Sequence, residues 1–139
     1  MTDITFDSIN PGDELPVLAK PAIDRTTLAL FAGASNDHNP IHIDIDFARK
    51  AGMDDVFAHG MLSMAYLGQL LTNWVPQTAL RNFGVRFGSI TNLGNEITCS
   101  GKVVDKFEEE GEKRVRLELQ AADQNGDVKL IGQAIVALP

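Results

Sequence analysis

A carboxylate, an amide and two imidazoles surround one proline in the segment Ala34-Ser35-Asn36-Asp37-His38-Asn39-Pro40-Ile41-His42. On a continuous helix Asp37 and His42 would lie about 140° apart, because each residue turns the chain by about 100°. Pro40 forbids that helix and biases Asn39 towards an extended conformation. The segment therefore predicts a fixed irregular turn in which Asp37 and His42 can face one point and exchange protons. A structural loop could use the same residues for Asx turns and capping.

A second candidate segment, Ala58-His59-Gly60-Met61-Leu62, stands at the entrance to an apolar helix. Backbone N–H groups in the first turn of a helix have no partner inside it and lie at its positive end, so the Gly60 N–H suits a developing oxyanion. The alternative is that Gly60 merely relieves crowding at a helix start. We interpret His59 as a structural hydrogen-bonding partner at the helix start, and His38 as a surface or loop-packing side chain.

The first half of the chain predicts three helices, at about 25–32, 46–51 and 61–74. Asp24 is a suitable N-cap for the first, and Asn36 can close it in the left-handed conformation. The third helix is apolar around most of its circumference and is stopped by Pro76, so we expect it to be buried on several sides. Gly68 within it would let another backbone approach closely.

The second half predicts four strands, at 82–90, 96–107, 113–122 and 128–138, with a fifth near 14–20. Glu110-Gly111 and Asn125-Gly126 mark two connections, and the second is a strong hairpin signal. A chain of 139 residues holds one core, so we expect a single α+β domain over residues 1–139. In this domain a curved antiparallel sheet of about five strands wraps around a central buried helix, a hot-dog-like arrangement.

Charge and composition narrow the classes of function. The formal net charge of -7 argues against nucleic acid as a partner. No apolar stretch could span a membrane, and the start Met1-Thr2-Asp3-Ile4-Thr5 lacks a signal peptide's basic flank, so a cytoplasmic protein is expected. The single cysteine, Cys99, is expected to be a buried apolar side chain. An anionic ligand would need local positive charge, for which the candidates are Arg49, Lys50, Arg81 and Arg86; each could equally be a solvated surface charge.

Together these segments resemble the MaoC-like family of (R)-specific enoyl-CoA hydratases and (R)-3-hydroxyacyl-thioester dehydratases. They resemble the dehydratase subunits of long-chain fatty-acid elongation still more closely. The resemblance is carried by Phe6-Asp7-Ser8-Ile9-Asn10-Pro11-Gly12-Asp13, Asn39-Pro40-Ile41-His42, Ala58-His59-Gly60-Met61-Leu62 and Val85-Arg86-Phe87. It implies a hot-dog fold, usually dimeric, that adds water to trans-2-enoyl thioesters or removes it from (R)-3-hydroxyacyl thioesters. Asn36 departs from the family, in which a glycine is common at that position.

The resemblance also implies roles for single residues. Asp37 and His42 would be the acid/base pair, Asn39 an orienting residue and the Gly60 N–H the oxyanion donor, without a metal or a cofactor. The substrate would be an acyl-CoA or an acyl-carrier-protein thioester, and the partner an identical or related hot-dog subunit. The acyl pocket is expected to involve the buried helix and the segment 53–57. The candidate substrate-binding residues are Phe57, Met61, Arg81 and Arg86, with both arginines near the subunit boundary.

Two other functions stay open. A hot-dog thioesterase usually relies on a carboxylate on or near its central helix, and residues 61–74 contain none. A metal-dependent hydrolase is disfavoured, because Asp37, His42 and His59 lack a recognisable ligand spacing. From a different class, the chain could be a non-catalytic acyl-thioester-binding subunit of a heterodimeric dehydratase.

Overall fold

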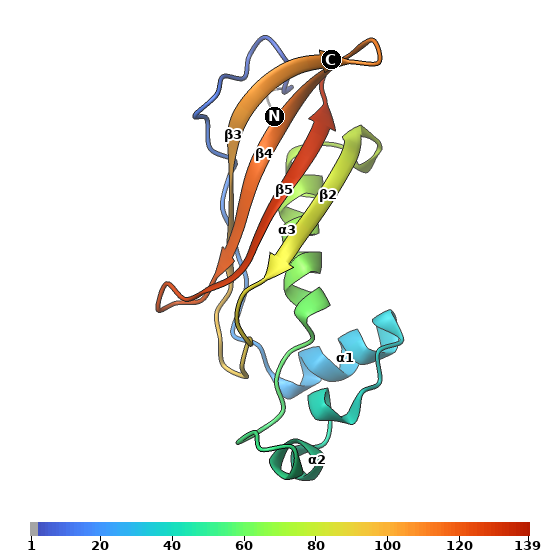
Figure 1. The fold of residues 1–139 in the computed structure, drawn as a ribbon, viewed down its shortest axis with the longest axis vertical. Coiled ribbons are helices and arrows are strands. Elements are labelled where there is room, and N and C mark those ends of the chain that lie inside the picture. The colour runs from blue at the N-terminus through green and yellow to red at the C-terminus, as the bar shows by residue number, and fades with distance from the viewer. Residues whose placement is uncertain (1–2) are drawn as a thin grey trace.

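The computed structural model describes residues 3–139 (Figure 1). Its elements follow in the order β1 (Leu18–Ala19), α1 (Arg25–Ser35), the short 3-10 helix η1 (Pro40–His42), α2 (Ile45–Lys50), α3 (Gly60–Trp74), the short 3-10 helix η2 (Gln77–Ala79), β2 (Leu80–Phe87), β3 (Thr98–Glu109), β4 (Glu112–Ala122) and β5 (Val128–Ala137). None of these helices is long and apolar enough to cross a bilayer.

The five strands form one antiparallel sheet in the order β1-β3-β4-β5-β2. Tight turns join β3 to β4 at Glu110 and Gly111, and β4 to β5 at Gly126, all with positive φ. The strand β2, which follows α3, closes the other side of the sheet against β5. The sheet curls around α3, as Figure 1 shows. The predicted single α+β domain with a hot-dog arrangement is thus confirmed.

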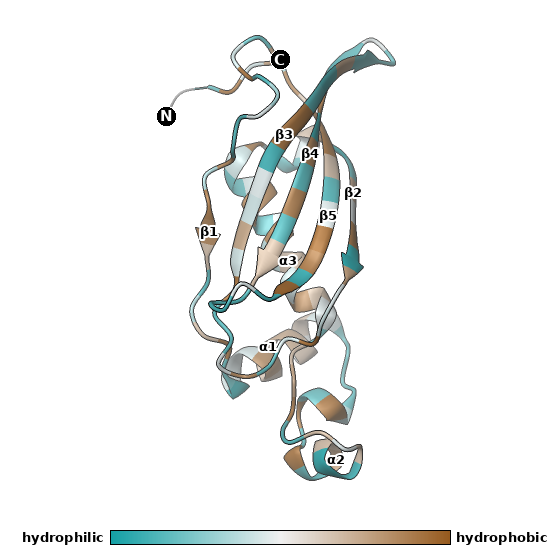
Figure 2. Cartoon of the chain, turned by 60° about the vertical axis from the view of Figure 1, so that its left-hand side comes forward, coloured by the Kyte–Doolittle hydropathy of each residue, from teal (hydrophilic) through white to brown (hydrophobic). Residues whose placement is uncertain are grey.

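The helix α3 fills the concave side of the sheet. Its residues Leu67, Leu70 and Leu71 are at most 1% exposed, and they belong to one core with Val115 and Leu117 of β4. Hydrophobic and hydrophilic residues alternate along β3, β4 and β5 (Figure 2), as strands with one face on a core require. Full burial of each leucine side chain contributes roughly 1.5–3 kcal/mol. The prediction that this helix is buried on several sides is confirmed.

The strand predicted near 14–20 is wrong in length. Only Leu18 and Ala19 pair with β3, and Glu14 forms an isolated bridge to Lys102. Pro16 lies between the two contacts and has no N–H to donate, so the ladder is interrupted there. The resulting edge strand is only two residues long.

The prediction that Gly68 lets another backbone approach closely is wrong. The nearest atom to the position that a Cβ would take is a ring carbon of Phe83, at 3.6 Å. That distance is an ordinary van der Waals contact. The glycine therefore leaves space beside an aromatic ring of β2.

The helices α1 and α2 lie at one end of the sheet, below the first turn of α3 in Figure 1. The Asp24 side chain accepts a hydrogen bond of 2.8 Å from the Thr27 N–H, and Asn36 ends α1 with φ of 62°. Both predicted caps are confirmed. The chain leaves α1 through this left-handed residue and enters the turn that carries Asp37.

Candidate active site

The turn between α1 and η1 is held by its own polar side chains. The Asp37 carboxylate accepts a hydrogen bond from the Asn39 N–H at 3.2 Å, and the Asn39 side-chain oxygen accepts one from the Ile41 N–H at 3.1 Å. Pro40 then opens η1. Asp37 and Asn39 thus form the Asx turns of a structural loop, while the rest of the Asp37 side chain stays exposed. The structural role and a catalytic role are compatible.

His42, the last residue of η1, is only 9% exposed. Its Nδ1 lies 2.7 Å from the carbonyl oxygen of Phe57, which is an acceptor, so Nδ1 carries the proton. In the neutral ring Nε2 is then free to accept a proton. The Phe57 ring also meets the His42 ring edge-on at 5.1 Å. Phe57 therefore orients the imidazole, whereas the sequence predicted it to bind substrate.

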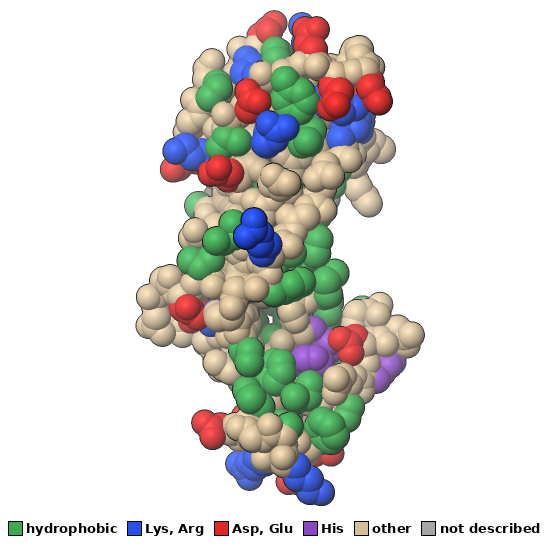
Figure 3. All heavy atoms as spheres, in the orientation of Figure 1, with side chains coloured by type: hydrophobic (Ala, Val, Ile, Leu, Met, Phe, Trp, Pro, Cys, Tyr) green, Lys and Arg blue, Asp and Glu red, His purple; other side chains and the backbone are tan. Residues whose placement is uncertain are grey.

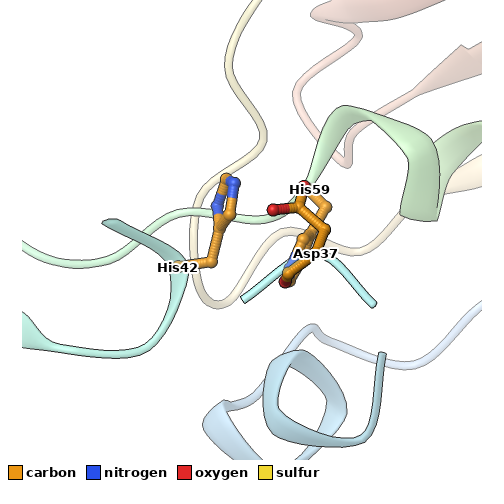
Figure 4. A group of neighbouring side chains, drawn as sticks. All are labelled: Asp37, His42 and His59. Atoms are coloured by element: carbon orange, nitrogen blue, oxygen red, sulfur yellow. The ribbon is translucent and has the colours of Figure 1, made fainter. Parts of the chain in front are cut away.

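Asp37, His42 and His59 come together from the turn after α1, from η1 and from the residue before α3. One side-chain ligand atom from each lies within 4.8 Å of the others, and Figure 4 shows the Asp37 carboxylate facing the His42 ring. In the space-filling view histidine side chains are visible on the lower part of the molecule, one of them beside an acidic side chain (Figure 3). The turn around Pro40 thus has the predicted effect of bringing Asp37 and His42 together. This places a proton acceptor opposite an imidazole at the surface.

Gly60 begins α3, so its N–H has no acceptor inside the helix. A Cβ at this position would lie 2.8 Å from a ring carbon of Phe87, which is closer than real Cβ contacts. Glycine therefore relieves crowding, as the alternative interpretation held. Its N–H, which has no acceptor inside the helix, also lies at the positive end of the helix.

An apolar cavity of about 420 Å³ lies beside these groups, lined by Phe31, Ser35, Asp37, Met61, Met64, Ala65, Gly68 and Phe83. Asp37 is the ionisable residue among them. Met61 is 52% exposed. The walls come from α1, α3 and β2, and the segment 53–57, expected in the pocket, is not among the lining residues. The sequence analysis missed Phe31 and Phe83, whose contribution depends on how α1 and β2 dock on α3.

The structure brings neither predicted arginine to this cavity. Arg81, the second residue of β2, donates to both carboxylate oxygens of Glu112, at 2.6 and 2.8 Å. Arg81 and Phe87 lie near the two ends of the eight-residue strand β2, roughly 20 Å apart. Arg86 lines a different hollow of about 1050 Å³ together with Lys102 and Glu118.

Asp37, His42 and His59 are residue types that zinc accepts. However, the His42 Nδ1 and His59 Nε2 atoms already lie 2.7 and 3.1 Å from the carbonyl oxygens of Phe57 and Asp37. The two rings are stacked, with centroids 4.0 Å apart and planes 27° apart. The lone pairs of stacked rings run side by side and do not converge on one ion. The arrangement suits proton transfer better than coordination.

Comparison with known proteins identifies the family of this chain. A family model described as a MaoC like domain matches residues 9–125. The (R)-specific enoyl-CoA hydratase of Rhodospirillum rubrum is 29% identical over 136 residues, covering 96% of this chain and 91% of the relative. The mitochondrial 3-hydroxyacyl-[acyl-carrier-protein] dehydratase of Arabidopsis thaliana is 26% identical over 110 residues, covering 78% and 66%.

Among solved structures, the R-hydratase PhaJ1 from Pseudomonas aeruginosa superposes with a TM-score of 0.86 at 26% identity, covering 99% of this chain and 86% of that one. The finer likeness to elongation dehydratase subunits stays a prediction. The family match includes the turn with Asp37 and His42 and the start of α3 at Gly60. This chain therefore belongs to the MaoC-like family.

Proposed function

We propose that this chain catalyses the reversible addition of water to trans-2-enoyl thioesters, giving (R)-3-hydroxyacyl thioesters. The observation that carries the proposal is the Asp37 carboxylate facing the His42 imidazole beside an apolar cavity and the first N–H of α3. The relatives support it: one is an (R)-specific enoyl-CoA hydratase and another a 3-hydroxyacyl-[acyl-carrier-protein] dehydratase.

The proposed reaction moves one water across one double bond. Asp37 and His42 hold the water between them, its hydroxyl oxygen bonds to C3, and a proton reaches C2. Each proton transfer by such a group typically contributes on the order of 10²- to 10⁴-fold. The two groups act as a pair, and neither is assigned as the formal base. Asn39 acts by fixing the turn, since its side chain accepts from the Ile41 N–H.

The thioester oxygen gains negative charge as water attacks C3. In the proposal the Gly60 N–H donates to this oxygen; loss of one such donor typically costs about 10²- to 10³-fold in turnover. The acyl chain enters the cavity, where Met61 and Met64 offer apolar contact. The thioester bond stays intact, so no thiol is released.

The test is a pair of assays on crotonyl-CoA. Hydration removes the enone absorbance, while a thiol reagent detects hydrolysis. We expect absorbance to fall with no release of thiol. Release of thiol would instead identify a thioesterase, and an unchanged substrate would identify a non-catalytic binding subunit.

We also propose that the chain works as a dimer, with itself or with a related hot-dog subunit. The edge strand β1 has two residues, whereas the edge strand β2 has eight. A long unpaired edge offers backbone N–H and C=O groups to a second sheet. Light scattering at assay concentration should report about twice the 15.1 kDa chain mass, or a multiple of it. A fully active monomer would contradict the proposal.

A further inference from the structure

His59 occupies the N-cap position of α3 but does not act as a cap. Its side chain makes no hydrogen bond to the helix, although capping positions favour short side chains that do. The imidazole is only 1% exposed, and its Nε2 lies 3.1 Å from the main-chain oxygen of Asp37. The buried ring at the start of α3 therefore makes its hydrogen bond to the neighbouring turn and not to the helix.

The same ring touches both members of the acid/base pair. Its Nε2 meets the backbone of Asp37, and its face stacks on the ring of His42 at 4.0 Å. Phe31 of α1 closes on it edge-on, with ring centroids 5.0 Å apart. Its rotation is thus restricted by contacts from α1, from η1 and from the turn between them. A shift of His59 would move both groups.

The hydrogen bond to a carbonyl assigns the proton of His59 to Nε2. Its Nδ1 is then an acceptor that is buried without a hydrogen-bond partner among residues 3–139. An unpaired buried acceptor costs free energy, and a leucine of similar size would avoid that cost. The hydrogen bond from Nε2 to the Asp37 carbonyl oxygen must therefore offset this cost.

We propose that His59 is a positioning residue that holds Asp37 and His42 against each other as a neutral Nε2–H imidazole. The inference rests on the proposed function. Burial lowers the pKa of His59; the Asp37 carbonyl and carboxylate oppose this and His42 adds to it. A charge on His59 would lie against the stacked His42 ring. His59 therefore stays uncharged while the pair Asp37 and His42 moves protons.

Two kinds of variant separate the donor from the ring. His59→Gln keeps an amide N–H near the place of Nε2 but loses the ring, whereas His59→Phe keeps a ring to stack on His42 and loses the donor. His59→Asn, whose shorter amide falls short of the Asp37 carbonyl, is a second variant without the donor that adds no bulk to the core. His38→Gln removes the exposed neighbouring histidine and is the matched control.

The measurements are kcat and KM for crotonyl-CoA across pH, and the nitrogen NMR titration of the His42 ring. We expect His59→Phe and His59→Asn to lower kcat by about 10- to 100-fold with KM nearly unchanged, because a small misplacement costs that much. Their His42 titration should shift, His59→Gln should recover most of the rate, and His38→Gln should match the wild type.

Wild-type kcat and an unchanged His42 titration in the variants without the donor would overturn the proposal. Loss of rate only in proportion to the folded fraction, followed by circular dichroism, would also overturn it, because it would reduce His59 to a packing residue. If the wild-type protein hydrates nothing, the proposed function fails. The His42 titration still decides whether His59 positions that ring.

Discussion

Two clusters of ionisable side chains lie at opposite ends of the sheet. At one end, the paired end, the carboxylate forms ion pairs with arginines; at the other, the unpaired end, the carboxylate has no such partner among residues 3–139. At the end where β2 begins, Glu112 bonds to Arg81 and Arg114, and these arginines lower the pKa of its carboxyl to about 2. At the end where α3 begins, Asp37 faces an imidazole, and no ion pair to it occurs within residues 3–139.

The difference separates groups that stabilise from groups that are left available. A carboxylate with two guanidinium partners has its hydrogen-bonding capacity filled from within the protein. A carboxylate that shares only one backbone N–H keeps acceptor sites for a water or a substrate. Breaking either cluster should therefore affect a different property, activity at one end and stability at the other.

The largest effect is expected at the unpaired end. Asp37→Asn and His42→Ala should each lower turnover by at least about 10²-fold, as expected for acid/base residues. The asparagine keeps a side-chain oxygen for the Asn39 N–H, so the turn and the melting temperature should be preserved. Glu112→Gln is the matched control and should keep full turnover. Near-normal activity in either site variant would remove that residue from the mechanism.

A third cluster, around Lys129, extends the comparison into the interior. Lys129 is 3% exposed, and its ammonium donates to Asp127 at 2.6 Å and to the Ile90 carbonyl at 2.9 Å, with Asp123 at 3.5 Å. Lys129→Met leaves the Asp123 carboxylate, whose side chain is 6% exposed, without its cation. We expect the melting temperature to fall by about 5–10 °C while kcat is kept.

The control for this prediction is Lys102→Met on β3, where the lysine is exposed. Its melting temperature should stay near that of the wild type. Equal losses in the two variants would show that the buried network contributes no more than a surface charge.

Much of this arrangement was predictable because it depends on local chemistry. Pro40 alone excludes the helix that would separate Asp37 from His42, and Asp24 and Asn36 signal the bounds of α1. The orientation of His59 was not predictable, because its Nε2 meets a carbonyl 22 residues away. The pairing of Arg81 was missed for the same reason, since Glu112 lies 31 residues along the chain. Such contacts depend on how elements pack, and periodicity carries no information about them.

A smaller effect is expected at the paired end, and it depends on pH. The folded pKa of Glu112 lies below its ordinary value of 4.5, so its stabilisation is present above about pH 4.5 and is lost as pH falls towards 2. Glu112→Gln should lower the melting temperature by a few degrees at pH 7, and the difference should vanish near pH 2. Because this carboxylate is about one-third exposed, solvent screening keeps the effect modest. A difference that persists at pH 2 would assign it to packing. The control is Glu108→Gln, exposed on β3.

The smallest effect is expected from removing metal ions, which tests whether a cation binds Asp37, His42 and His59. Asp37, His42 and His59 place one ligand atom each within 4.8 Å, which is the strongest argument for a cation among the described residues. Coordination would need the His42 Nε2 and His59 Nδ1 lone pairs to meet on one ion, yet the stacked rings hold them side by side. Prolonged treatment with EDTA should therefore leave the hydration rate unchanged, and added Zn²⁺ should not raise it. Loss of activity on chelation, restored by a divalent ion, would show that the cluster is paired after all, and would favour metal-dependent hydrolysis over acid/base catalysis by Asp37 and His42.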